Sequence, residues 1–146
     1  ANADGSMSDI NYTVFRYAEV LLIAAEALNE INNGPTQSAY DYINQVRRRA
    51  RNADGNAHSY PADVTPGLSQ TAFRDSVMEE RRIELSFEYK RWYDIVRRDL
   101  LEEVFSGPDA LETRSVDPSR HYLLPLPQDE LDRNPNLRPD GSNNGY

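Results

Sequence analysis

A row of glutamates between residues 79 and 88 has a spacing that catalysis or metal binding could use. Glu80, Glu84 and Glu88 recur every four residues, so they would share one face of a helix. Paired carboxylates act as general acid and base in glycosidases, and they hold metal ions in some helical bundles. A third hypothesis is a structural network, in which arginines neutralise the three negative charges.

The spacing favours the structural network over the two chemical hypotheses. Helical carboxylate metal sites also use a Glu-x-x-His pair, and neither His58 nor His121 lies in an expected helix. A glycosidase holds its two carboxylates across a cleft rather than in one helical row. We therefore expect Arg91, Arg97 and Arg98, on the next helix, to neutralise the row. The predicted network consists of Glu80, Arg81, Glu84, Glu88, Arg91, Asp94 and Arg97.

Motifs for other kinds of catalysis are absent from the sequence. The chain has no cysteine, which excludes disulfides, thiolate catalysis and cysteine-based zinc sites. It contains neither a Gly-x-Ser-x-Gly elbow nor a glycine-rich phosphate loop. We therefore predict a protein without enzymatic activity, catalytic residues, metal or cofactor.

Aromatic residues could bind sugars, because their rings stack on the apolar faces of pyranoses. Trp92 is the only tryptophan, but its neighbours Ile95 and Val96 place it in the expected core. His58 and Tyr60 lie in a long polar loop and are the candidates for contact with a ligand. An ordinary surface loop is the preferred interpretation of both, so the ligand-binding residues stay unknown.

The charge balance argues against nucleic acid as a partner. The net charge is −8 and the sequence pI is about 4.7, so the surface would repel a phosphate backbone. The run of four arginines between residues 47 and 51 is the one basic cluster, and we interpret it as a solvated or ion-paired helix face. No stretch is long and apolar enough to span a bilayer.

Apolar periodicity predicts two antiparallel helical hairpins separated by a loop. Helices are expected at residues 12–31, about 36–51, about 69–89 and 91–101. Thr36 or Ser38 can cap the second helix, and Ser69 or Thr71 can cap the third. The loop, residues 52–68, is rich in glycine and proline and has no periodicity. The fold class is therefore all-α.

The tail from residue 106 onward is rich in Pro, Gly, Asn and Asp. Only residues 121–126 are apolar enough to pack or to pair briefly as a strand. We expect this tail to form an extended Pro-rich strap laid over the helices. Because 146 residues suit one core, we expect residues 1–146 to form a single domain.

Several segments, in order along the chain, resemble the SusD/RagB family. Residues 15–28 are similar to its R-x-A-E-V-x-L-x-x-A-E-A helix, and residues 43–50 resemble the helix that follows. Residues 80–97 are similar to the family block E-R-R-x-E-L-x-F-E-G-x-R-W-x-D-L-x-R. Residues 122–127 and 134–137, with Gly145–Tyr146, resemble its closing strap. Two departures are Tyr89, where the family usually has Gly, and a looser approach to the final Gly-Tyr at residues 138–144.

The resemblance implies a tetratricopeptide-like fold and the C-terminal part of a longer protein. It implies a non-catalytic lipoprotein, anchored on the outer face of the outer membrane by a segment outside this chain. Such a protein would capture a glycan, oligosaccharide or other nutrient, and its partner would be a SusC-like TonB-dependent transporter. No ligand residue carries over to a matched position. The alternative is a purely structural scaffold that packs on the transporter or on the missing half.

Overall fold

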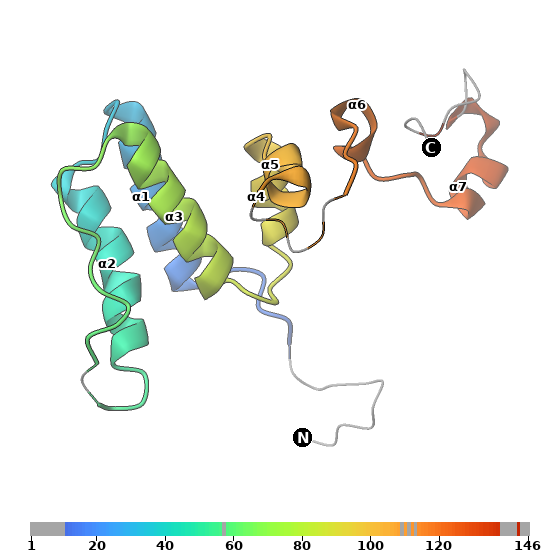
Figure 1. Cartoon of the computed structure of the whole chain (residues 1–146). Helices are drawn as coiled ribbons and strands as arrows, with labels where there is room; N and C mark the ends of the chain where they lie inside the picture. The colour runs from blue at the N-terminus through green and yellow to red at the C-terminus, as the bar shows by residue number, and fades with distance from the viewer. Residues whose placement is uncertain are drawn as a thin grey trace. The chain divides into compact units, whose positions relative to one another are not determined.

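The computed structural model describes residues 11–56, 58–108, 110, 112, 114–137 and 143, and these residues are helical without any strand (Figure 1). The all-α prediction is therefore confirmed for the part of the chain described. The chain forms two compact units, Ala1–Arg91 and Trp92–Tyr146. That residues 1–146 act as one domain stays a prediction.

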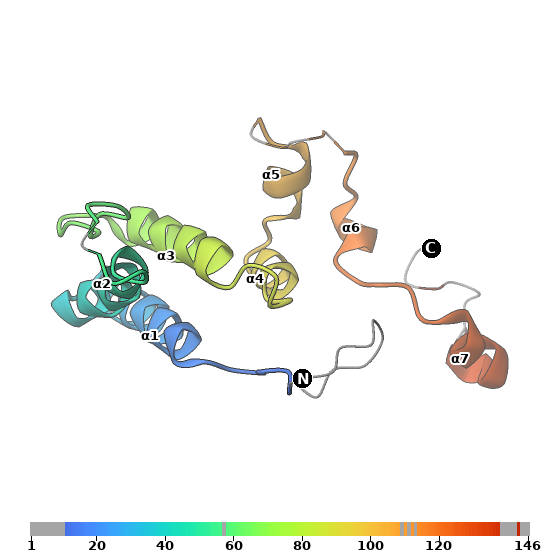
Figure 2. The same ribbon diagram turned by 90° about the horizontal axis from the view of Figure 1, so that it is seen from below.

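Three helices of equal length build the first unit. They are α1 (Tyr17–Ile31), α2 (Gln37–Arg51) and α3 (Gln70–Glu84). Helix α1 packs against both α2 and α3, which touch each other little, as the two views in Figures 1 and 2 show. A short turn joins α1 and α2 into the predicted antiparallel hairpin.

Local sequence explains where these helices begin and end. The Thr36 hydroxyl accepts a hydrogen bond from the Ala39 amide at 3.3 Å, and the Ser69 hydroxyl accepts one from Ala72 at 3.2 Å. Both are N-cap bonds, which satisfy amides that lack a partner in the helix. Asn33, with φ of 52°, helps to end α1 in the left-handed conformation common at helix ends.

Two helices are shorter than predicted. Helix α1 begins five residues late, because the residue before it, Arg16, has extended backbone with φ of −137°. Helix α3 stops at Glu84 instead of near residue 89. Phe87 and Tyr89 follow with φ of 65° and 58°, and a right-handed helix cannot continue through them. Tyr89 thus adopts a glycine-like backbone at the position where the family usually has Gly.

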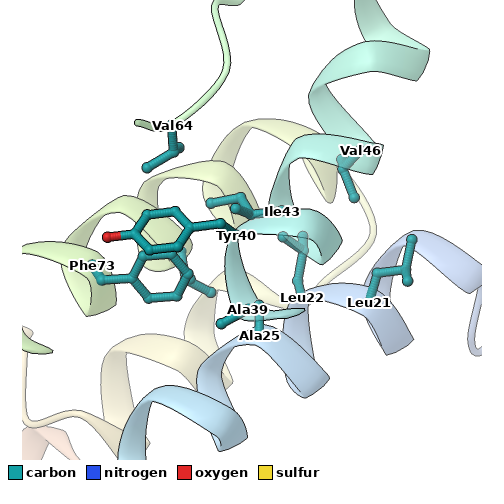
Figure 3. Packing of buried hydrophobic residues seen from close by; sticks show 10 residues of the cluster. Leu21, Leu22, Ala25, Ala39, Tyr40, Ile43, Val46, Val64 and Phe73 are labelled. Carbon is teal, nitrogen blue, oxygen red and sulfur yellow. The ribbon is translucent and has the colours of Figure 1, made fainter. Parts of the chain in front are cut away.

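The core of the first unit lies between α1, α2 and α3 (Figure 3). Leu22, Ile43, Phe73 and Val77 are fully buried, and burial of such a side chain contributes about 1.5–3 kcal/mol. The Tyr40 and Phe73 rings meet edge to face, with centroids 4.9 Å apart. The core members are Leu21, Leu22, Ala25, Ala39, Tyr40, Ile43, Val46, Val64, Phe73 and Val77.

The second unit contains short helices joined by irregular chain. They are α4 (Arg91–Arg97), α5 (Leu101–Ser106), α6 (Pro118–His121), α7 (Gln128–Arg133) and the 3-10 helix η1 (Pro135–Leu137). The single helix predicted at 91–101 is wrong, because Asp99 has φ of 53° and separates α4 from α5.

The interior of the second unit is small. Ile95, Leu101 and Leu131 are buried. Trp92, which we predicted to be a core residue, is only half-buried. The residues 121–126 form no strand. Their end is held by Asn143, whose side chain accepts from the Leu126 amide at 2.7 Å and donates to its carbonyl at 3.2 Å.

Candidate functional site

The three glutamates of the row are paired with arginines, two of them (Glu80 and Glu84) in α3 and Glu88 in the turn after it. The buried Glu80 carboxylate accepts a hydrogen bond from Arg47 Nε of α2 at 2.7 Å. The Oε1 atom of Glu84 accepts two hydrogen bonds, one from Arg16 Nη1 at 2.5 Å and one from Arg49 Nη2 at 2.6 Å. Arg49 Nη2 also donates to the other oxygen, Oε2, at 2.5 Å, so both oxygens of Glu84 accept hydrogen bonds from guanidinium groups.

Arg16 links the end of α3 to the chain before α1. Its Nε donates to both carboxylate oxygens of Glu88 at 2.9 Å, and its Nη2 donates to the backbone carbonyl of Glu84. The hydrogen bond to Glu88 is the main cause that raises the pKa of Arg16 above its ordinary value. Partial burial opposes this rise, and contact with Glu84 adds to it. The guanidinium thus remains charged and acts as a fixed cation.

Three arginines that were not expected at the row lie beside it. They are Arg16, Arg47 and Arg49, which pair with Glu80, Glu84 and Glu88. Arg16 reaches the row because α3 ends at residue 84 and packs on α1, which brings the chain before α1 to the end of α3. Arg97 pairs with the buried Asp94 three residues earlier in α4, at 2.9 Å. That Arg91, Arg97 and Arg98 also neutralise the row stays a prediction.

A second charged cluster contains Arg81 of the predicted network together with Glu19 and Lys90, which were not singled out in the sequence. Glu19 and Arg81 are both buried, with Oε1 and Nη2 3.7 Å apart. Lys90 Nζ lies 3.1 Å from Glu19 Oε2, donates to the Val14 carbonyl at 2.7 Å and sits 4.5 Å above the Phe15 ring. A usable signal was present, because Glu19 lies next to the apolar run of residues 20–25 in α1.

The basic run on α2 holds the loop 52–68 against the helix. Arg47 donates to the carbonyl of Ala62 at 2.9 Å, and Arg51 donates to that of Pro61 at 2.5 Å. Asp63 pairs with Arg51 at 2.7 Å and with Arg48 at 3.4 Å. The interpretation of this run as an ion-paired helix face is therefore confirmed.

A buried amide fixes the loop further. The Asn44 side chain accepts from the Val64 amide at 2.7 Å and donates to the Val64 carbonyl at 3.0 Å. The Val64 side chain points into the core beside Tyr40 and Ile43 (Figure 3). The loop is thus anchored to the core at Val64, although its sequence has no periodicity.

The loop candidates His58 and Tyr60 lie in its first half. His58 Nε2 is 2.9 Å from Asp54 Oδ2, and both side chains are more than half exposed. Tyr60 is 80% exposed, so its ring is open to a ligand. The hydrogen bond to His58 is the main cause that lowers the pKa of Asp54. A ligand role for His58 and Tyr60 stays a prediction.

The chemistry open to this arrangement is limited. A general acid or base must reach a substrate proton, but the oxygens of Glu84 already accept bonds from protein groups. In the described ranges, no group of three or more His, Cys, Asp and Glu side chains could hold a metal ion. The geometry suits a rigid scaffold or a binding surface better than bond making.

Comparison with known proteins identifies the family. The whole chain, residues 1–146, matches the model of the SusD family. SusD-like protein P2 of Formosa agariphila is 52% identical over 147 residues, which make up 100% of this chain and 28% of that protein. SusD-like protein P25 of the same organism is 40% identical over 142 residues, 93% of this chain and 25% of that protein.

Solved structures agree with these sequence matches. A SusD homolog from Bacteroides thetaiotaomicron is 34% identical with a TM-score of 0.66, over 86% of this chain and 26% of that one. A SusD-like protein from Bacteroides fragilis is 29% identical with a TM-score of 0.60, over 84% and 24%. This agreement confirms the all-α, tetratricopeptide-like fold. The chain spans about a quarter of the length of these relatives, and it belongs to the SusD family.

Proposed function

We propose that this chain is part of a non-catalytic lipoprotein that binds glycans or similar nutrients for import across the outer membrane. The observation that carries the proposal is the match of the whole chain to the SusD family, with 52% identity to a SusD-like protein. The partner would be a SusC-like TonB-dependent transporter, and the lipid anchor would lie outside this chain. No helix among the described residues is long and apolar enough to cross a membrane.

The charged network supports a role without turnover. Glu80 and Glu84 are the carboxylates best placed by sequence for acid-base chemistry, and both are engaged by arginines from α2 or from the chain before α1. Removing these bonds to serve a substrate would leave buried charges without partners, which is costly. We therefore assign the network to holding α1, α2 and α3 together.

Calorimetry on a family-length protein tests the binding proposal. Such a protein can be made by replacing the 147 matched residues of SusD-like protein P2 with this chain, and we call it the grafted protein. We expect it to bind one member of a polysaccharide panel and to release no reducing sugar from it. Heat of binding to peptides alone would point to another nutrient, and sugar release lost in Glu84→Gln would make the protein a hydrolase.

A matched pair of tyrosine variants tests the loop candidates. Tyr60 and Tyr93 are 80% and 69% exposed, so replacing either with alanine removes a similar exposed ring. If Tyr60 stacks on a sugar, Tyr60→Ala weakens binding by the grafted protein and Tyr93→Ala does not. Equal affinity in both variants would leave the loop without a ligand role.

A second function, that of a scaffold, is favoured for the isolated segment. Its first unit is tied together by ion pairs, and its exposed side chains include a continuous apolar stripe on α1. A scaffold predicts that the 146-residue chain alone has no affinity for a sugar that the grafted protein binds. Binding of equal strength by the isolated chain would reject the scaffold and place the ligand site here.

A further inference from the structure

Helix α1 is apolar on two opposite faces. One face carries Leu22 and Ala25, which are fully buried against α2 and α3. The opposite face consists of Val20, Ile23, Ala24, Ala27 and Ile31, which we call the outer stripe. A surface helix normally has one apolar face, directed at the core, and a polar face opposite it.

The outer stripe is exposed in this structure except at Ala24, which is half-buried. Val20, Ile23 and Ile31 are 51%, 48% and 77% exposed. Positions 20, 24, 27 and 31 recur in steps of four, three and four, so they follow one side of the helix for about 17 Å. The two alanines, Ala24 and Ala27, leave room for a second helix to approach closely.

The neighbouring helices do not share this feature. On α2 the exposed positions include Asp41, Gln45 and Arg48, all polar or charged. On α3 they include Asp75 and Glu79, and Ile83 is a single exposed aliphatic residue near the end of the helix. In stacked helical repeats, the units at the ends of the stack have a polar outer face, and an interior unit is apolar on both sides. Helix α1 therefore has the composition of an interior element.

The chemistry of the stripe indicates its occupant. A sugar needs polar groups for its hydroxyls, and the stripe offers only aliphatic side chains. Nearly three quarters of SusD-like protein P2 lies outside the matched segment, and that part is available to cover the stripe. We infer that the outer stripe is the docking face for a helix from the rest of the family-length protein, packed closely over Ala24 and Ala27.

Cysteine labelling of the grafted protein tests this inference and does not depend on glycan binding. The chain has no cysteine, so Ala27→Cys introduces a single thiol with little change in volume. Gln45→Cys, on the exposed face of α2, is the matched control. We expect both to react with a maleimide equally fast in the isolated chain. In the grafted protein, Ala27→Cys should react at least about tenfold more slowly, because access then needs local opening.

Three results would overturn the inference. Fast labelling of Ala27→Cys in the grafted protein would show that the rest of the protein leaves the stripe open. Slow labelling in the isolated chain that speeds up on dilution would assign the stripe to a second copy. Slow labelling there at every concentration would assign it to this chain's own residues.

A charged variant gives an independent measurement. Ala27→Arg should leave the melting temperature of the isolated chain unchanged, because an exposed substitution rarely matters. It should lower that of the grafted protein by several degrees, because a buried cation would lack a partner. Gln45→Arg should affect neither protein. If Ala27→Arg changed the melting temperature of both proteins equally, or changed neither, no helix would be docked on the stripe.

Discussion

Replacing Glu84 with glutamine should lower the stability of this chain by about 2–3 kcal/mol. The substitution keeps the size of the side chain and removes its charge. Glu84 is only 7% exposed and contacts Arg16 and Arg49. It is also the point at which α3 is tied both to α2 and to the chain before α1.

The expected loss lies below the roughly 3–5 kcal/mol typical of breaking a buried ion pair. The Arg49 side chain is 60% exposed, so water can solvate it when the Glu84 charge is removed. The Arg49–Glu84 pair therefore contributes no more than the roughly 0–1 kcal/mol of a surface ion pair. Arg16 is 29% exposed and keeps its bonds to Glu88 at 2.9 Å. What is lost is mainly the charged hydrogen bond from Arg16, worth about 1.5–3 kcal/mol.

Urea unfolding followed by circular dichroism at neutral pH measures the loss. Glu79→Gln is the matched control, because it is the same substitution on the same helix. Glu79 pairs with Arg82 on the surface, where the two side chains are 48% and 50% exposed. The control should lose less than about 1 kcal/mol.

Two outcomes would refute this reasoning. If Glu84→Gln cost no more than Glu79→Gln, the network would not stabilise the fold. If Glu84→Gln unfolded like the parent chain but abolished ligand binding by the grafted protein, the row would belong to a functional site.

Three further predictions concern the backbone, the loop and acid stability. Tyr89→Gly should stabilise the chain to urea by about 1 kcal/mol, because φ is 58° at this residue. Asn44→Ala should cost about 2 kcal/mol and speed proteolysis of the loop, because two bonds to Val64 are lost. Arg74 lowers the pKa of Glu30 below 4.5 chiefly by a hydrogen bond, so Glu30 stabilises the fold above that pH. The stability advantage of the parent over Glu30→Gln should therefore shrink as the pH falls from 7 to 3, as urea midpoints would show.

Matched variants separate these causes from general damage. Tyr89→Ala still places a Cβ atom on a residue with left-handed backbone. If Tyr89→Ala stabilised the chain as much as Tyr89→Gly, backbone strain at residue 89 would not be the cause. Asn56→Ala removes an exposed amide from the same loop, and cleavage as fast as in Asn44→Ala would reject the anchoring role. If the stability advantage of the parent over Glu30→Gln grew as the pH fell, the ionised form of Glu30 would not be the one that stabilises the fold.

Helix positions followed well from the sequence because their causes are local. The caps at Thr36 and Ser69 and the stop near Gly34 lie within a few residues of the ends that they define. The errors came from backbone turns with little local signal. Phenylalanine rarely adopts positive φ, and aspartate does so only somewhat more often. Phe87 and Asp99 nevertheless have positive φ, and they end α3 and separate α4 from α5.

The partners of the charged row depended on packing between distant parts of the chain. Arg16 lies 68 residues before Glu84, and Arg49 lies 35 residues before it. From the sequence alone we expected arginines that follow the row, Arg91, Arg97 and Arg98, as partners. It could not show that α3 packs on α1, which brings Arg16 to the end of that helix.

The arginines of α2 anchor one part of the loop and leave another part without such bonds to α2. Arg47, Arg51 and Asn44 hold its residues 61–64, and Val64 is buried. This part cannot move without breaking several charged or buried bonds. His58 and Tyr60, the residues predicted to contact a ligand, lie just before it and are exposed. If these residues do contact a nutrient, the anchor beside them lowers the cost of binding, because less order has to be gained when the ligand arrives.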